Sequence, residues 1–134
     1  MSQQGLITTA SVHSFAQTMM LLEVALLERK LTVFARIDHA AGAAEAEMEL
    51  RPTTLYIFGN PRAGTPLMQA AQQIGLQLPL KILVWEDAFG QTWLSYDDLA
   101  WIARRFSLDP AMPAVVAMSK ALAAITDDAG RKRN

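Results

Sequence analysis

The stretch Leu55-Tyr56-Ile57-Phe58-Gly59-Asn60-Pro61-Arg62-Ala63-Gly64-Thr65-Pro66 carries the strongest structural signal in this chain. Its apolar and aromatic beginning is typical of a strand, and the segment from Gly59 to Gly64 is typical of a loop. Thr65 followed by Pro66 predicts a helix start, because proline suits the first helical position. We therefore expect a strand, a loop and a helix in succession.

Hydrophobic periodicity and turn residues divide the rest of the chain into further elements. Strands are predicted over residues 6–9, 31–38, 53–58, 81–86 and 91–96. Helices are predicted over residues 12–29, 40–47, 65–74, 98–106 and about 110–126. Ser11 is expected to cap the first helix, Gly75 to end the third, and Gly90 to occupy the αL position of a hairpin.

This order of elements predicts an α+β fold. The succession β-α-β-β-α-β-β-α, followed by an extra C-terminal helix, indicates a two-layer sandwich on a mostly antiparallel sheet, with the helices on one face. A chain of 134 residues that is 51% hydrophobic suits a single domain over residues 1–134.

Composition excludes several classes of protein. The chain has 12 basic and 13 acidic residues, and three of the basic ones, Arg131, Lys132 and Arg133, lie in a basic tail at residues 130–134. The remainder is acidic, which argues against nucleic-acid binding. There is no cysteine, and His13 and His39 lack metal-ligand spacing, so we expect no metal and no cofactor. Without a secretory signal or membrane span, a cytoplasmic protein with no membrane partner is expected.

The loop after the central strand is the first candidate binding site. Gly59 and Gly64 have the spacing of a phosphate-binding loop, but no lysine follows Gly64, which excludes a nucleoside triphosphatase. Backbone amides, Asn60, Arg62, Gly64 and Thr65 could hold a carboxylate or a single phosphate. The alternative is an ordinary connection in which Asn60 caps the turn and Gly64 supplies a positive φ.

A second polar group, Arg36, Asp38 and His39, ends the preceding strand. If the two strands are antiparallel neighbours, this group cannot meet Asn60 and Arg62; if another strand separates them in a parallel sense, the groups could form one pocket. In that pocket Asp38 or His39 could act as a base and Arg62 as an anion clamp. The alternative for His39 is a structural role at the start of the Ala-rich helix.

An aromatic face is the third candidate. Alternation places Phe34, Tyr56 and Phe58 on the side of the sheet opposite Ala35, Leu55 and Ile57, which are expected to face the core. The hairpin register pairs Trp85 with Trp93 on that same outer side, with Leu83 alongside. These six residues predict a homodimer interface. A register slip by one residue, a C-terminal helix folded over this face, and a ligand groove are the alternatives.

Several blocks together resemble domain-of-unknown-function family 302. They are residues 34–39, 50–55, 58–61, 64–68, 78–81, 84–87 and 93–96, and the similarity extends over about residues 8–108. The resemblance implies a small two-layer fold with a curved antiparallel sheet that commonly forms dimers. It implies no activity, so it assigns no catalytic residue.

Two functional hypotheses follow. The first is a homodimeric binding module for a small anionic or aromatic ligand, and the second is a small enzyme that uses Asp38 or His39 with Arg62.

Overall fold

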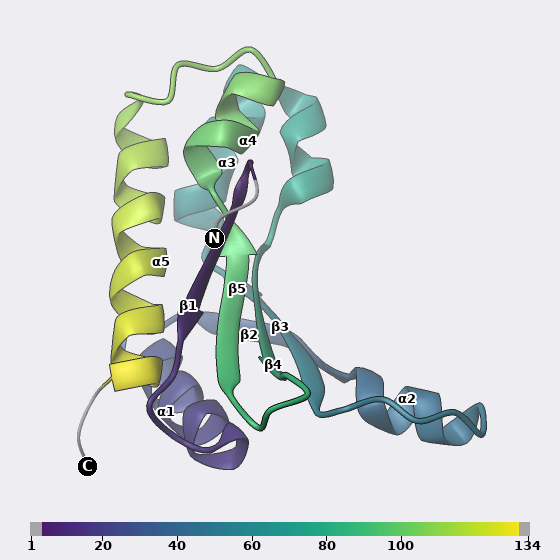
Figure 1. The fold of residues 1–134 in the computed structure, drawn as a ribbon. Coiled ribbons are helices and arrows are strands. Elements are labelled where there is room, and N and C mark those ends of the chain that lie inside the picture. The colour runs from purple at the N-terminus through teal and green to yellow at the C-terminus, as the bar shows by residue number, and fades with distance from the viewer. Residues whose placement is uncertain (1–3, 132–134) are drawn as a thin grey trace.

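The computed structural model describes residues 4–131 and contains one five-stranded sheet (Figure 1). All neighbouring strands are antiparallel, and their order across the sheet is β1-β5-β4-β3-β2. The strands are β1 (Leu6–Ala10), β2 (Thr32–Asp38), β3 (Thr53–Gly59), β4 (Leu80–Glu86) and β5 (Thr92–Asp97). The predicted α+β class, antiparallel sheet and strand positions are confirmed.

Five α-helices and a short 3-10 helix join or follow these strands. They are α1 (Phe15–Glu28), α2 (His39–Glu45), α3 (Pro61–Ala70), the 3-10 helix η1 (Gln72–Gln77), α4 (Leu99–Arg105) and α5 (Pro113–Arg131). Helices α1 and α5 pack against each other and against one face of the sheet. Helix α2 projects away from the rest of the fold at the end of β2 (Figure 1).

The main core lies between the sheet and the α1–α5 pair. Its fully buried members include Leu22 and Leu26 from α1, and Leu122 and Ile125 from α5. The sheet contributes Tyr56, Phe58, Ile82, Val84 and Leu94. Val115, Met118, Leu122 and Ile125 recur at helical spacing, which predicts a buried stripe on this helix, and all four are buried. A smaller second core joins α3, η1, α4 and the first half of α5.

The predicted assignment of sheet faces is wrong for β3. Tyr56 and Phe58 point into the core beneath α1 and α5, whereas Leu55 and Ile57 lie half-exposed on the other face. Both pairs are apolar, so alternation alone does not reveal which one the helices cover. The largest rings fill the space between two helices and the sheet, and the Tyr56 hydroxyl donates a 2.5 Å hydrogen bond to Glu23 Oε2 on α1.

A bulge at Phe34 explains why the predicted alternation of side chains along β2 is also wrong. Val33 pairs with Phe58 and Ala35 pairs with Ile57, so Phe34 has no partner across the strands. An inserted residue shifts the alternation, and Val33 therefore does not share a face with Ala35 and Ile37. Arg36 pairs with Tyr56 across the strands, and its side chain lies on the helix side of the sheet. The Arg36 Cζ atom is 5.8 Å from the centroid of the Tyr56 ring, and Arg36 Nη1 forms an ion pair with Glu23 Oε2 at 3.2 Å.

The starts of two helices also differ from the prediction. Ser14 caps α1, whereas Ser11 is buried and its hydroxyl lies 2.7 Å from that of Thr18. Helix α3 begins at Pro61 after the N-cap Asn60, not at Thr65, and Pro66 lies inside it. Asn60 provides a capping oxygen immediately before a proline, which makes it the earlier and sufficient start signal.

The glycine and C-terminal predictions have mixed outcomes. Gly90 has φ +83° as predicted, but Gly75 lies inside η1 without a positive φ, so it does not end a helix in the αL conformation. Helix α5 begins at Pro113 and continues to Arg131, beyond the predicted residue 126. Arg131 of the predicted basic tail is thus helical and pairs with Asp127, while Lys132 and Arg133 lie outside the described residues.

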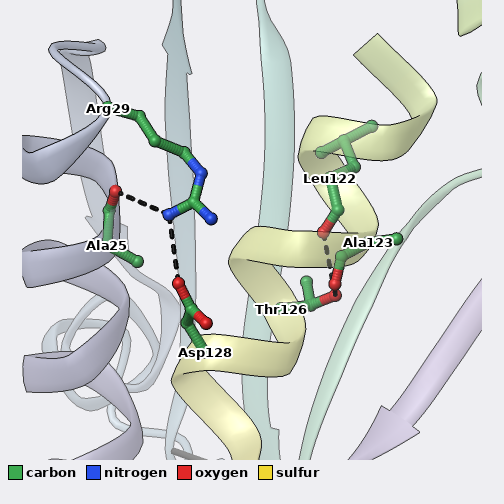
Figure 2. A network of polar contacts seen from close by, with 6 residues as sticks. All are labelled: Ala25, Arg29, Leu122, Ala123, Thr126 and Asp128. Carbon is green, nitrogen blue, oxygen red and sulfur yellow. Dashed lines mark hydrogen bonds and ion pairs between the residues drawn. The ribbon is translucent and has the colours of Figure 1, made fainter. Parts of the chain in front are cut away.

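An ion pair holds the far ends of α1 and α5 together (Figure 2). Arg29, at the C-cap of α1, donates from Nη1 to the Ala25 carbonyl at 3.3 Å and to Asp128 Oδ2 at 3.1 Å. On α5, the buried Thr126 hydroxyl donates to the Leu122 carbonyl at 2.9 Å. The pair is partly exposed, so its main effect is to orient α5 over the sheet rather than to add much stability.

The partly buried hydrogen bond between Tyr56 and Glu23 gives the first prediction. Tyr56→Phe should lower the free energy of unfolding by about 1–3 kcal/mol, because it removes a hydrogen bond to a charged group. Burial, and then the bond to Glu23, raise the pKa of the Tyr56 hydroxyl. A raised pKa means that stability is kept below about pH 10 and is lost above it. Tyr56→Phe should therefore weaken this alkaline loss in urea titrations followed from pH 7 to 11.

Tyr96→Phe is the matched control, since the pKa of Tyr96 is also raised by burial but its hydroxyl is not bound to Glu23. The Tyr96→Phe variant should keep the part of the alkaline loss of stability that depends on the Tyr56 hydroxyl. An unchanged unfolding free energy in Tyr56→Phe would contradict the role of the Glu23 contact.

Candidate functional site

A cavity of about 360 Å³ opens where the C-terminal end of β3 meets α3 and α5. We call it the α3–α5 pocket. Its walls are almost wholly apolar and come from four segments of the chain. They are Leu31, Phe34, Gly59, Asn60, Pro61, Ala63, Gly64, Thr65, Met68, Leu78, Pro79, Leu80, Ala117, Met118, Ala121 and Ile125.

Small side chains create the hollow. Ala63 and Gly64 on α3 face Ala117 and Ala121, which are four residues apart on one side of α5. The adjacent α5 residues Met118 and Ile125 are buried and form the floor toward the two cores. A Cβ atom on Gly64 would meet Leu78 Cδ1 at 3.5 Å, an ordinary contact, so this glycine leaves space rather than avoiding a clash.

Three of the four residues that the sequence predicts as ligand-binding in this loop line the pocket, namely Asn60, Gly64 and Thr65, whereas Arg62 does not. Its backbone amides are used inside α3. The Arg62 N–H donates to Asn60 Oδ1 at 2.9 Å, and the Ala63 and Gly64 N–H groups donate to the Asn60 carbonyl. Pro61 has no N–H to offer. A phosphate cradle of free amides is therefore not formed, and the loop presents side chains instead.

The second polar group lies elsewhere. Strands β2 and β3 are antiparallel neighbours, and Asp38 pairs with Thr54 while Thr32 pairs with Gly59. Seven strand residues at about 3.3 Å each place Asp38 and His39 roughly 20 Å from Asn60 and Arg62. A base must reach its proton directly or through one water, so an enzyme site that joins His39 and Arg62 is excluded.

Each member of that group has a structural role or an exposed position. Asp38 is the N-cap of α2 and its Oδ1 accepts the Ala41 N–H at 2.9 Å. His39 is the exposed first residue of α2. Arg36 belongs to the Glu23–Tyr56 cluster on the helix side of the sheet.

The sheet face opposite α1 and α5 is the other candidate surface. Many of its positions are apolar and only partly buried: Ala35, Ile37, Leu55, Ile57, Leu83, Trp85 and Trp93. We call this set the open sheet face. The polar residues Thr8, Thr53, Lys81 and Ser95 lie on the same side of the sheet. The predicted pairing of Trp85 with Trp93 is confirmed, and their rings stack with centroids 6.0 Å apart. Leu83 also lies here, whereas Tyr56 and Phe58 are core residues and Phe34 lines the pocket.

Hydrogen bonds hold both indoles in place. The Trp85 Nε1–H donates to Ser95 Oγ at 2.9 Å, and the Trp93 Nε1–H donates to Asp87 Oδ2 at 2.9 Å. The Trp93 bond, together with the N–H groups of Gln91 and Phe89, lowers the pKa of the Asp87 carboxyl. The rings thus form a rigid apolar platform rather than mobile surface side chains.

Within residues 4–131, no group of three or more histidine, aspartate or glutamate side chains is placed to hold a metal ion. None of the described helices combines the length and apolar character needed to cross a bilayer.

Sequence reasoning did not find most of the pocket wall. Met68, Leu78, Ala117 and Ala121 come from segments that looked like ordinary helix and loop. The sequence signal for this wall is the pair of alanines, Ala117 and Ala121, beside the buried α5 stripe. Periodicity does not predict which surface these alanines face, because that depends on where α5 packs.

Known proteins that resemble this chain include longer ones. It is 49% identical over 104 residues to "Fluoride-specific ion channel FluC 1" of Brucella suis biovar 1 (strain 1330), covering 78% of this chain and 41% of that protein. A protein of the same name from Brucella abortus biovar 1 (strain 9-941) is 49% identical over 104 residues, with 38% of its length covered. The chain thus spans about two fifths of the curated relatives it matches.

The fold has a solved counterpart. The crystal structure of an uncharacterized conserved protein DUF302 from Bacillus stearothermophilus superimposes with a TM-score of 0.84, at 19% identity, over 95% of this chain and 99% of that one. The family described as "Domain of unknown function DUF302" matches residues 7–126. With nearly the whole chain matched and the same fold in that solved structure, this protein belongs to the DUF302 family.

Proposed function

We propose that this protein is a homodimeric binding module whose α3–α5 pocket takes a small ligand with an apolar or aromatic body. The pocket is the observation that supports this most directly. Its volume of about 360 Å³ lies within the range of small-molecule sites, and its lining is apolar with a few polar groups at the mouth. Filling it would remove apolar wall from water, which favours binding.

Ala121→Leu should test the pocket, because it adds three carbon atoms to the wall of the hollow. With 1-octanol as the probe, we expect the variant to bind about tenfold more weakly than the original protein, since the added side chain occupies the ligand's space. Isothermal titration calorimetry measures the affinity, and a smaller ligand-induced rise in melting temperature provides an independent check.

Ala123→Leu is the matched control. It makes the same change on the same helix at an exposed position outside the pocket, and should leave octanol affinity unchanged. Equal affinity in the original protein and Ala121→Leu would show that octanol does not bind here, and would count against the proposal.

The open sheet face supports the homodimer. An antiparallel sheet with one uncovered face normally places polar residues there, whereas apolar residues, two of them fixed indoles, outnumber the polar ones on this face. Contiguous apolar surface of this kind marks interaction sites. A second copy could cover the face with an identical platform, as a two-fold axis requires.

Trp85→Glu should convert the dimer into a monomer, because it would bury an unpaired charge in the interface. Light scattering should show the mass falling by half. Phe89→Glu is the control: Phe89 is 95% exposed at the hairpin tip, away from the open sheet face, and its replacement should leave the dimer intact. A monomeric mass for the original protein would refute this interface.

The relatives suggest a second candidate role. In Brucella suis the matching segment is part of a longer protein named as a fluoride-specific ion channel. Two domains joined in one chain bind each other at a high effective concentration. A separate chain related to one of these domains can bind the same partner, but with lower apparent affinity. On this basis we propose that the protein acts alongside such a channel.

Removal of the 104 matched residues from the Brucella suis relative should change the rate of fluoride efflux from vesicles, as measured with a fluoride electrode. Addition of the present protein at high concentration should restore the original rate. Identical efflux with and without the matched segment would contradict this candidate role.

A further inference from the structure

The charged residues that directly adjoin the lining of the α3–α5 pocket in the sequence are all basic, and we call them the basic border. Four charged residues are direct sequence neighbours of pocket-lining residues, and all four are cations: Lys30, Arg62, Lys81 and Lys120. Acidic residues outnumber basic ones in the whole chain, so an entirely basic border is not what the composition predicts.

Three of these cations are free to meet a ligand. Lys30 precedes Leu31 in the turn before β2, Arg62 lies in the first turn of α3, and Lys120 precedes Ala121 on α5. All three are exposed, and none takes part in the ion pairs found within residues 4–131. Lys81 differs, because its ammonium donates to the carbonyls of Gln77 and Pro79.

Neutral donors supplement this charge. Asn60 and Thr65 line the pocket, and the Asn60 oxygen is occupied by the Arg62 N–H, which leaves the amide nitrogen of Asn60 as a donor. The α3 amides are already bonded within the helix, so the site lacks the cradle that a polyphosphate needs. A single carboxylate needs only one or two such donors and a nearby cation.

We propose that the ligand is an amphipathic monocarboxylate, with its apolar body in the α3–α5 pocket and its carboxylate at the basic border. This rests on the proposed function and adds the chemical class of the ligand. A neutral apolar molecule would gain nothing from the three cations, and an amine would be repelled by them.

Three probes with the same eight-carbon alkyl chain separate the two claims. Nonanoate, 1-octanol and octylamine differ at pH 7 only in the charge and shape of the head group. An exposed ion pair contributes a factor of about 1.4 to 5 in affinity, so three cations predict nonanoate binding about threefold to a hundredfold tighter than octanol. Octylamine should bind most weakly. Raising the salt from about 0.05 M to about 1 M should shrink the nonanoate advantage, because exposed charges are screened.

Removal of single charges then shows which cations produce the preference. Arg62→Gln should lower the nonanoate-to-octanol affinity ratio, and the triple variant Lys30→Gln, Arg62→Gln, Lys120→Gln should bring it close to one. Octanol affinity should stay the same in each variant, which also shows that the pocket is still folded. Arg104→Gln removes an equal charge at an exposed position of α4 that adjoins no lining residue, and it should leave the ratio unchanged.

The outcomes are distinct. Equal binding of nonanoate and octanol, or tighter binding of octylamine, would overturn the carboxylate assignment while the apolar pocket stands. A nonanoate preference that survives in the triple variant would overturn the role of these cations. Failure of all three probes to bind would overturn both the assignment and the proposed function.

Discussion

Burial of Tyr56 and Phe58 beneath α1 and α5 is the constraint on which the rest of the structure depends. Both rings are fully removed from solvent at the centre of the main core. A buried tyrosine needs a partner for its hydroxyl, and Glu23 on α1 supplies one, while Arg36 balances the carboxylate charge. This contact joins the first helix, the second strand and the third strand, and so sets which side of the sheet is covered.

Both candidate surfaces follow from that choice of face. With Tyr56 and Phe58 turned inward, Leu55 and Ile57 must turn outward, where they continue a sheet face that also carries Trp85 and Trp93. The chain leaves the core after Phe58 and starts α3 at once. Helix α5 passes the C-terminal end of β3 with Ala117 and Ala121 facing it. Because these side chains are small, a cavity remains there instead of a packed contact.

The two surfaces lie on opposite sides of the sheet, which has a consequence for the proposed module. A second copy on the open sheet face would leave the α3–α5 pocket accessible, so ligand binding and dimer formation need not compete. Between them lie β3 and β4, whose residues alternate between the two sides. A ligand that shifts Leu80 or Gly59 would act on strands that also form the open sheet face.

The sequence by itself determined the element types, the antiparallel α+β class, the Trp85–Trp93 pair and the buried stripe of α5. These depend on local periodicity, turn residues and hairpin register, which are properties of short segments. Only the tertiary structure decided which face of β3 is buried, because Leu55, Tyr56, Ile57 and Phe58 are all apolar and a bulge at Phe34 disturbs the neighbouring strand. It also decided the pocket, whose walls come from segments more than 90 residues apart and meet only once α5 has packed beside α1.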